Sequence, residues 1–323
     1  MISYLTKERI VAEYSKVPVK EYANDVIKKM ANPLVSVILI TYQQKPFIAK
    51  ALDAVLAQET TFPFEIILCD DDSTDGTREI CIEYADRYPD KIRFFLHRRE
   101  NNRKVLGKPS GIFQYTYSLL QARGKFIAIC SGDDFWQDET KLEKQARFLV
   151  ENPDHSLVYT SWVECTYDKN TDSFGPPSPL KSSFPKASTT MHVSFSKEIP
   201  VQFLDVIQED VFSWFILEQK GRFGFLPDIR PTAITVLPES LSRSNTEKQL
   251  ASHALNVPVK LIEAYKDSPY RKQARAKLLG TIRGLLNNPK YKPIRNWLIT
   301  KSIFLFFRYN LFGVALQKKL NRY

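Results

Sequence analysis

The sequence predicts an α/β fold with a mostly parallel central sheet, and two observations lead to this prediction. Short apolar runs rich in β-branched residues alternate with stretches of helical character, which is the order of successive strand–helix–strand units. The apolar runs also stop abruptly at clusters of polar, turn-forming residues, as buried strands do. With 43% hydrophobic and 25% charged residues over 323 positions, the chain has the composition of a globular enzyme.

Four apolar runs are expected as strands, at residues 34–40, 64–69, 92–96 and 125–130. Helices are expected over residues 77–88, 111–123 and 139–150. Further along, we expect a strand over 156–166, a proline-rich loop or lid over 173–188, and a buried helix over 210–219. Ligands of such sheets bind beyond the carboxyl ends of the strands. Polar residues fall at three of these ends, namely Thr41, Asp70 to Asp72, and Asp133 with Asp134.

The two ends of the chain differ from this region. The N-terminal sequence MISYLTKERIVAEY carries charges where a signal peptide needs its apolar centre, and it indicates a partly helical arm. Residues 268–323 hold 13 Lys and Arg and no acidic residue, whereas the rest of the chain holds 33 basic and 36 acidic residues. We therefore predict an N-terminal helical arm (1–33), an α/β catalytic domain (34–240) and a basic helical C-terminal segment (241–323).

The C-terminal segment contains a strongly apolar stretch, residues 297–316. Lys301, Arg308 and Asn310 interrupt it, which argues against a membrane-spanning helix. Aromatic residues beside Lys and Arg suit a membrane interface, where each base near an anionic leaflet contributes about 1 kcal/mol. The alternative is that the apolar residues pack on the catalytic domain. We favour an anionic membrane surface as partner and consider nucleic acid unlikely, because no nucleic-acid recognition module accompanies the charge.

The four cysteines predict the compartment. Cys69, Cys81, Cys130 and Cys165 show no CxxC spacing and no histidine cluster, so neither a zinc site nor a disulfide framework is indicated. Cys69 and Cys130 end apolar runs, where cysteine usually serves as a small buried hydrophobe. Reduced, buried thiols predict a cytoplasmic protein, peripheral on the inner face of the cytoplasmic membrane if the basic segment docks there.

Three acidic clusters are candidates for chemistry. Asp133 and Asp134 together would bind Mn²⁺ or Mg²⁺ and leave coordination positions for diphosphate oxygens. The alternative is that Asp134 caps a turn and Asp133 is merely solvated. A carboxylate of Asp70 or Asp71 would accept a hydrogen bond from a nucleobase N–H or a ribose hydroxyl. Asp, Ser, Thr and Gly in this order also make an ordinary strand-to-helix turn, which is the alternative. A carboxylate at residues 209–210 would act as a general base, or simply as a favourable charge at a helix N-terminus.

A family resemblance adds to these observations. The segments VSVILITYQQKPFIAKALDAVLAQ, EIILCDDDSTDGT, GKFIAICSGDDFW with KLEKQARFLVENPD, and QEDVFSWFILEQKGRFGFLPD follow one another in order. Together they resemble the inverting family 2 glycosyltransferases of the GT-A fold over roughly residues 34–240. Four motifs in order and at the family's spacing are far more specific than any single motif.

The resemblance implies an enzyme that moves a sugar from a nucleotide-diphosphate donor to a glycan or lipid-linked acceptor during cell-surface glycan biosynthesis. The acceptor oxygen would attack the anomeric carbon opposite the leaving diphosphate, without a covalent sugar–enzyme intermediate. The implied site residues are Thr41, Tyr42, Asp70, Asp71 and Asp133 for the donor nucleotide, Asp133 and Asp134 for the metal, Asp210 as the base, and Glu209 and Trp136 as acceptor-side support.

The chain departs from the family pattern at three positions. Asp72 stands where many relatives have glycine, and Ser131 where many have the first carboxylate of the metal motif. Leu237 stands where relatives commonly have a histidine, and His253 is too remote in sequence to be assigned in its place. These departures keep a second hypothesis open, a non-catalytic relative that binds a nucleotide sugar or acts as a scaffold.

Overall fold

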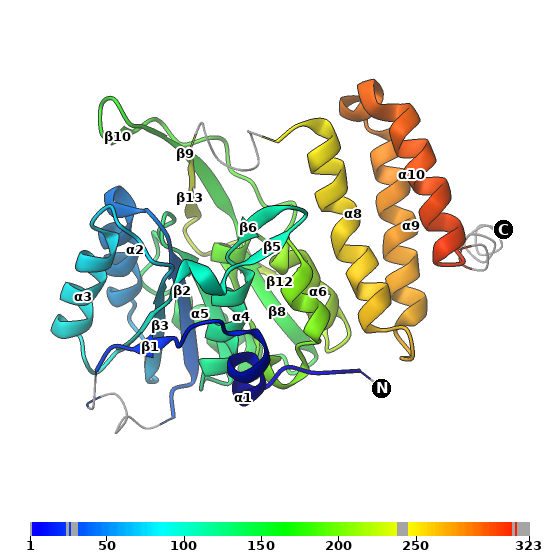
Figure 1. Ribbon diagram of the computed structural model, residues 1–323. Coiled ribbons are helices and arrows are strands. Elements are labelled where there is room, and N and C mark those ends of the chain that lie inside the picture. The colour runs from blue at the N-terminus through cyan, green and yellow to red at the C-terminus, as the bar shows by residue number, and fades with distance from the viewer. Residues whose placement is uncertain (1, 24–25, 27–31, 238–244, 312–313, 315–323) are drawn as a thin grey trace.

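The structure is a computed structural model that describes residues 2–23, 26, 32–237, 245–311 and 314. Its main feature is an eight-stranded sheet (Figure 1). In spatial order the strands are β1 (Lys20–Glu21), β4 (Ile92–Leu96), β3 (Phe64–Asp70), β2 (Val35–Thr41), β7 (Phe126–Ser131), β11 (Thr190–Val193), β8 (His155–Thr160) and β12 (Arg222–Leu226). The four apolar runs expected as strands are confirmed as β2, β3, β4 and β7.

The middle of the sheet is parallel, as predicted. Strand β2 pairs in parallel with both β3 and β7, and β3 pairs in parallel with β4. Strand β11 runs antiparallel to its two neighbours, and β12 is parallel to β8. Thr41 lies opposite Asp70, and Ile40 lies opposite Ser131. The carboxyl ends of these strands therefore meet at one edge of the sheet.

Side chains of the central strands alternate between two apolar layers, which explains why the strands read as continuous apolar runs. Val37 and Leu39 belong to the layer formed with α2 (Lys45–Leu56), α3 (Thr77–Arg87) and α5 (Lys141–Glu151). Ile38 belongs to the opposite layer, formed with α4 (Ile112–Gln121) and α6 (Glu209–Glu218). Each face of the sheet is thus covered by helices.

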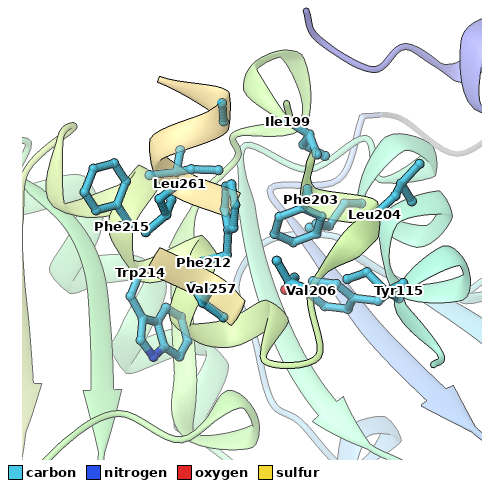
Figure 2. Close-up of a cluster of buried hydrophobic side chains, with 14 of the residues drawn as sticks. Tyr115, Ile199, Phe203, Leu204, Val206, Phe212, Trp214, Phe215, Val257 and Leu261 are labelled. Carbon is cyan, nitrogen blue, oxygen red and sulfur yellow. The ribbon is translucent and has the colours of Figure 1, made fainter. Parts of the chain in front are cut away.

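Within residues 245–311, the basic C-terminal segment forms three helices that lie at one end of the molecule (yellow to red in Figure 1). They are α8 (Glu247–Ala264), α9 (Arg271–Asn287) and α10 (Arg295–Arg308), with a 3₁₀ turn, η7 (Pro289–Ile294), between the last two. Val257 and Leu261 of α8 lie beside Phe212 and Phe215 of α6 in one buried cluster (Figure 2). The segment therefore continues the hydrophobic core of the sheet. None of the helices in the described ranges is long and apolar enough to cross a bilayer.

The N-terminal arm is only partly helical and also contributes a strand. A short helix α1 (Lys7–Arg9) continues into one π-helical turn, η1 (Ile10–Tyr14), and Leu5 and Ile10 are fully buried. Strand β1 then pairs with β4 at the sheet edge. Two residues carry too little pattern for a strand prediction, so this edge strand was not expected.

The prediction of a single strand over residues 156–166 is wrong. Strand β8 ends at Thr160, and after Ser161 the chain enters β9 (Trp162–Asp168), which belongs to a separate three-stranded sheet with β10 (Ser173–Phe174) and β13 (Thr232–Val236). One apolar stretch supplies both strands, so the sequence gives no sign of the change of sheet. Residues 173–188 are largely loop, as expected, and end in a 3₁₀ turn, η4 (Ala187–Thr189).

Candidate functional site

The polar residues at the ends of β2 and β7 are packed tightly together. The Thr41 hydroxyl donates to Gln44 Oε1 over 2.8 Å. A Cβ on Gly132, just after β7, would lie 2.5 Å from Gln44 Oε1 and 2.8 Å from Thr41 Cβ. Only glycine fits this approach, because such distances are far shorter than any van der Waals contact. The sheet edge is thus a preformed surface built from two strand ends.

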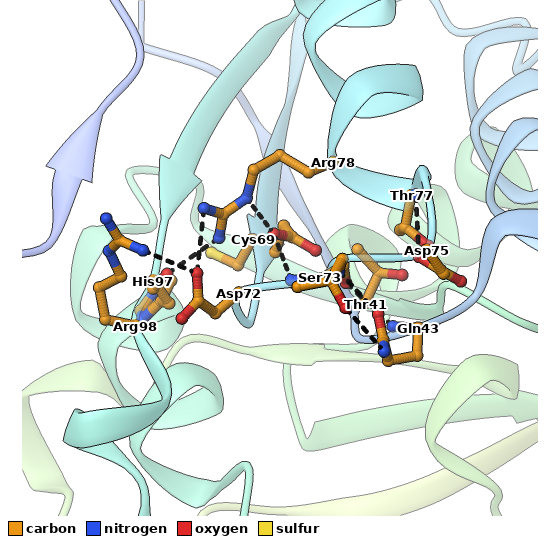
Figure 3. Close-up of polar contacts among 12 residues, drawn as sticks. Thr41, Gln43, Cys69, Asp72, Ser73, Asp75, Thr77, Arg78, His97 and Arg98 are labelled. Carbon is orange, nitrogen blue, oxygen red and sulfur yellow. Dashed lines mark hydrogen bonds and ion pairs between the residues drawn. The ribbon is translucent and has the colours of Figure 1, made fainter.

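Asp70 is held from inside the protein by Arg78 and Ser73, both of which are labelled in Figure 3. Its side chain is fully buried, and Oδ2 accepts hydrogen bonds from Arg78 Nε over 2.6 Å and from the Ser73 amide over 3.1 Å. Its other oxygen, Oδ1, is buried with no hydrogen-bond partner in the described structure. Asp70 therefore anchors the loop after β3 and keeps one oxygen for a further donor.

Asp71 shows the same half-satisfied arrangement. Oδ2 accepts from Arg99 Nη1 and Asn102 Nδ2, each over 2.7 Å, whereas Oδ1 is buried without a partner among the described residues. Burial raises the pKa of Asp71, and Asn102 and Arg99 oppose that rise. The Arg99 guanidinium also lies 3.9 Å from the ring centre of Tyr42, which is 42% exposed. A buried oxygen with no partner beside an exposed aromatic ring is what a nucleobase needs.

Asp72, which stands where many relatives have glycine, adopts a left-handed backbone conformation. Asp72 has a φ of +66°, in the left-handed region that glycine favours and that aspartate tolerates. Its carboxylate lies 3.2 Å from Arg78 Nη1 and 3.1 Å from Arg98 Nη1. These ion pairs help to hold the strained backbone.

Asp134 is engaged on both oxygens. It is 6% exposed, and it accepts hydrogen bonds from the Ser188 hydroxyl at Oδ2 over 2.5 Å and from the Thr235 amide at Oδ1 over 2.9 Å. Burial raises the pKa of Asp134 to about 8, and the charge of Asp133 adds to the rise. The side chain expected to bind a metal thus links the sheet edge to the 173–188 loop and to β13.

Asp133 is more accessible than its neighbour. Its side chain is partly exposed and is hydrogen-bonded to Gln44, and burial raises its pKa. Within the described ranges, no three His, Cys, Asp or Glu side chains come together as a metal cluster. Mg²⁺ in phosphate-transfer sites is commonly held by one or two carboxylates plus substrate phosphates, so Asp133 fits a site that the donor diphosphate completes.

Trp136, which was expected on the acceptor side, and Ser131, one of the departures from the family pattern, belong to the same network. The Trp136 indole N–H donates to the Ser188 carbonyl over 2.8 Å, and the side chain is 4% exposed. The Ser131 amide donates to the Ser188 hydroxyl over 3.1 Å, and the hydroxyl oxygens of the two serines lie 3.3 Å apart. Trp136 therefore supports the 173–188 loop from inside rather than presenting a surface to an acceptor. Leu237 lies half-buried directly after β13.

The third acidic cluster begins α6. Burial raises the pKa of Glu209 to about 7, and the charge of Asp210 adds to the rise. Burial also raises the pKa of Asp210, whereas the Val211 amide, which donates to Oδ1 over 2.7 Å, opposes the rise. Carboxylates with pKa values raised toward neutrality can exchange a proton near physiological pH.

Lys186 connects the acidic clusters and was missed by the sequence prediction. Its positive charge lowers the pKa of both Asp134 and Asp210. It stands in the proline-rich 173–188 loop, where no motif distinguishes it from any other surface lysine. The fold therefore places one cation within the electrostatic range of the sheet-edge and α6 carboxylates.

A cavity of about 500 Å³ opens on the Glu209 side of α6. Its walls come from the end of β2, the hairpin of β5 (Arg103–Val105) and β6 (Lys108–Ser110), α4, α8 and η7. His253 of α8 and Tyr291 of η7 are among the lining residues. These two residues were not predicted as site residues, because they follow Glu209 by 44 and 82 positions and belong to no motif.

Comparisons with known proteins agree with this arrangement. A family model described as Glycosyl transferase family 2 matches residues 36–198. The uncharacterized protein Rv1520 of Mycobacterium tuberculosis is 39% identical over 142 residues, which are 44% of this chain and 39% of that protein. The putative glycosyltransferase EpsE of Bacillus subtilis is 34% identical over 133 residues, which are 41% of this chain and 44% of EpsE. The alignments thus span about two fifths of these relatives.

A solved structure extends the likeness at the level of the fold. The Staphylococcus aureus TarS structure of residues 1–349 in complex with UDP-GlcNAc superimposes with a TM-score of 0.55 and 18% identity. The superposition covers 83% of this chain and 80% of the TarS chain, so the expected GT-A fold is confirmed. Since the family model covers half of the sequence and the sheet edge carries the acidic clusters, the chain belongs to glycosyl transferase family 2.

Proposed function

We propose that this protein is an inverting glycosyltransferase that moves a sugar from a nucleotide-diphosphate donor to an acceptor hydroxyl during cell-surface glycan assembly. The observation that carries the proposal is that the positive charge of Lys186 acts on both Asp134, after β7, and Asp210, at the start of α6. The same sheet edge also holds Asp71, whose buried Oδ1 has no partner among the described residues. The relatives support the substrate class: TuaG of Bacillus subtilis is named a putative teichuronic acid biosynthesis glycosyltransferase, and WfgD of Escherichia coli a UDP-Glc-dependent glucosyltransferase.

The nucleoside would lie at the ends of β2 and β3. A base N–H or ribose hydroxyl would donate to the buried Oδ1 of Asp71 or Asp70, which removes the cost of leaving that oxygen without a partner. The exposed ring of Tyr42 would contact the base, and Thr41 fixes the turn through Gln44. This half of the site binds and orients the donor.

The transfer step would be carried out at α6. Asp210 would accept the proton of the acceptor hydroxyl as that oxygen forms a bond to the anomeric carbon and the bond from this carbon to the diphosphate breaks. Glu209, whose pKa is raised to about 7, would hold a proton part of the time and keep repulsion between the two carboxylates low. Lys186 would stabilise the ionised base and the negative charge of the leaving diphosphate.

A divalent cation, Mn²⁺ or Mg²⁺, would be held by Asp133 together with the donor diphosphate, and it would supply positive charge to the leaving group. Asp134, Ser188 and Thr235 position this carboxylate rather than bind the ion, since both Asp134 oxygens already accept protein hydrogen bonds. The metal site therefore depends on the 173–188 loop for its shape.

The C-terminal segment would dock the enzyme on the anionic inner face of the cytoplasmic membrane, where lipid-linked acceptors lie. Helix α10 exposes four large apolar side chains, Ile299, Ile303, Phe304 and Phe307, which are between 41% and 66% exposed. Lys301 and Arg308, both exposed, stand among them. An exposed apolar face flanked by bases suits an anionic lipid surface.

Vesicle sedimentation tests this docking. We expect the protein to sediment with vesicles that contain phosphatidylglycerol and to remain free of pure phosphatidylcholine vesicles. The double change Phe304→Ser and Phe307→Ser should weaken sedimentation, whereas Phe225→Ser, at a 38% exposed aromatic of β12, should not. Equal binding of all three proteins would contradict the assignment.

Donor binding and transfer test the activity itself. A thermal-shift screen of nucleotide sugars with and without Mn²⁺ should reveal a metal-dependent rise in melting temperature with one donor. Asp210→Asn should keep this rise and reduce transfer by roughly 10²–10⁴-fold. Glu218→Gln, at the other end of α6, is the matched control and should behave as wild type. Donor binding without transfer, unchanged in Asp210→Asn, would instead favour a non-catalytic nucleotide-sugar-binding or scaffolding protein.

A further inference from the structure

We infer that the 500 Å³ cavity beside Glu209 is the subsite for a sugar ring of the acceptor, and that the C-terminal helices form its specificity wall. The inference rests on the proposed function in one respect, the assignment of the base to the start of α6. It goes further by naming the acceptor class and by giving the C-terminal segment a role in substrate choice besides any membrane contact.

The position of the cavity assigns it to the acceptor. Gln208 and Glu209, which line it, directly precede the proposed base Asp210. The donor-side residues Tyr42 and Asp71 do not line it. Ile40, near the end of β2, also lines the cavity. A group bound here would therefore lie between the end of β2 and the proposed base, whereas the nucleotide would contact Tyr42 and Asp71.

The chemistry of the lining fits a carbohydrate. A pyranose presents hydroxyls around its rim and an apolar face of C–H groups, so its site needs both polar side chains and an aromatic or aliphatic surface. Glu209, Gln208 and His253 supply polar atoms, and Tyr291 and Leu250 supply apolar surface. A volume of about 500 Å³ is within the range of small-molecule pockets, roughly 300–1,000 Å³.

The wall contributed by the C-terminal helices is firmly attached. Asn256 Nδ2 of α8 donates to the Asp205 carbonyl over 3.1 Å, just before α6. Val257 and Leu261 are buried against the aromatic side chains of α6 (Figure 2). The walls on the two sides of the cavity are therefore fixed relative to each other, as a selective pocket requires.

Saturation-transfer NMR on the full chain tests the subsite. The probes are the methyl glycosides of glucose, galactose, mannose, rhamnose, N-acetylglucosamine and N-acetylgalactosamine. We expect wild type to transfer saturation to at least one of them, and Tyr291→Ala to reduce that signal at least fivefold. Phe225→Ala, which removes an exposed aromatic of β12, should keep it. Leu250→Trp, which fills the cavity, is a second variant, and circular dichroism melting establishes that each protein is folded.

The outcomes separate this inference from the proposed function. The subsite would be overturned if none of the six sugars gave a saturation-transfer signal with wild type. Equal signals in wild type, Tyr291→Ala and Leu250→Trp would overturn it too. Either result would hold even if the enzyme hydrolyses a nucleotide sugar. Sugar signals that disappear in both variants would support the subsite even if no nucleotide sugar binds, and in that case only the proposed transfer reaction would fail.

Discussion

Replacing Asp134 by Asn should change how the stability of the protein depends on pH. The pKa of Asp134 is raised from 3.8 to about 8 because the carboxyl is buried. Between these two values the folded protein holds a proton that the unfolded chain has released, so the free energy of unfolding falls as pH rises. Asn can accept from the Thr235 amide and donate to the Ser188 hydroxyl, so the variant keeps both contacts without titrating.

The size of the effect follows from linkage. One proton bound only by the folded state changes the free energy of unfolding by about 1.36 kcal/mol per pH unit. From pH 5 to pH 7, wild type should therefore lose up to about 2.7 kcal/mol more stability than Asp134→Asn. Any other titrating group that behaves alike in the two proteins cancels in this difference.

Urea denaturation at pH 5, 6 and 7, in EDTA and without nucleotide, measures the difference. Asp90→Asn, at an exposed carboxylate, serves as the control and should show the wild-type slope. Parallel slopes for wild type and Asp134→Asn would refute the reasoning, because they would mean that Asp134 is ionised in the folded protein at neutral pH, as an open metal ligand would be.

Three further changes test other parts of the site. Arg78→Met leaves the carboxylate of Asp70 buried without its cation and should cost about 3–5 kcal/mol in urea denaturation, and a loss below about 1 kcal/mol would contradict the buried ion pair. Gly132→Ala places a Cβ 2.5 Å from Gln44 Oε1 and should reduce transfer on the order of 100-fold, so wild-type kcat/KM would show that this edge is not part of the site. Lys186→Met removes a cation that lowers the pKa of the proposed base, so the acidic limb of the pH–rate profile should move to higher pH, whereas Lys186→Arg should leave it in place. An unmoved limb in the Met variant would separate Lys186 from the base.

The sheet and the polar edge at the carboxyl ends of its strands could be predicted from sequence because their signals are local. Each buried strand is a continuous apolar run, and the parallel order brings the polar residues that follow the runs to one edge. The change of sheet at Ser161 could not be predicted, because β8 and β9 both consist of strand-forming residues and only their long-range partners differ.

The roles within the site depend on contacts between distant segments. Asp133 and Asp134 are equivalent in sequence, yet it is the carboxylate of Asp134 that accepts hydrogen bonds from Ser188 and Thr235, which follow it by 54 and 101 positions. Thr235 reaches Asp133 only at its backbone carbonyl. Adjacent acids thus predict a charged site but not which of them is free to bind a ligand. The role of Lys186 could not be predicted for the same reason, because it comes only from the carboxylates that the fold brings near this lysine.

The N-terminal arm has a consequence for the behaviour of the protein in concentrated solution. Without β1, strand β4 would present a row of unpaired backbone N–H and C=O groups at the sheet edge, which is a template for pairing with another chain. Removing residues 1–23 would also empty the buried positions of Leu5 and Ile10 and uncover apolar surface. The arm therefore protects the sheet edge from the pairing that leads to aggregation. A two-residue strand is sufficient because it need only occupy the edge.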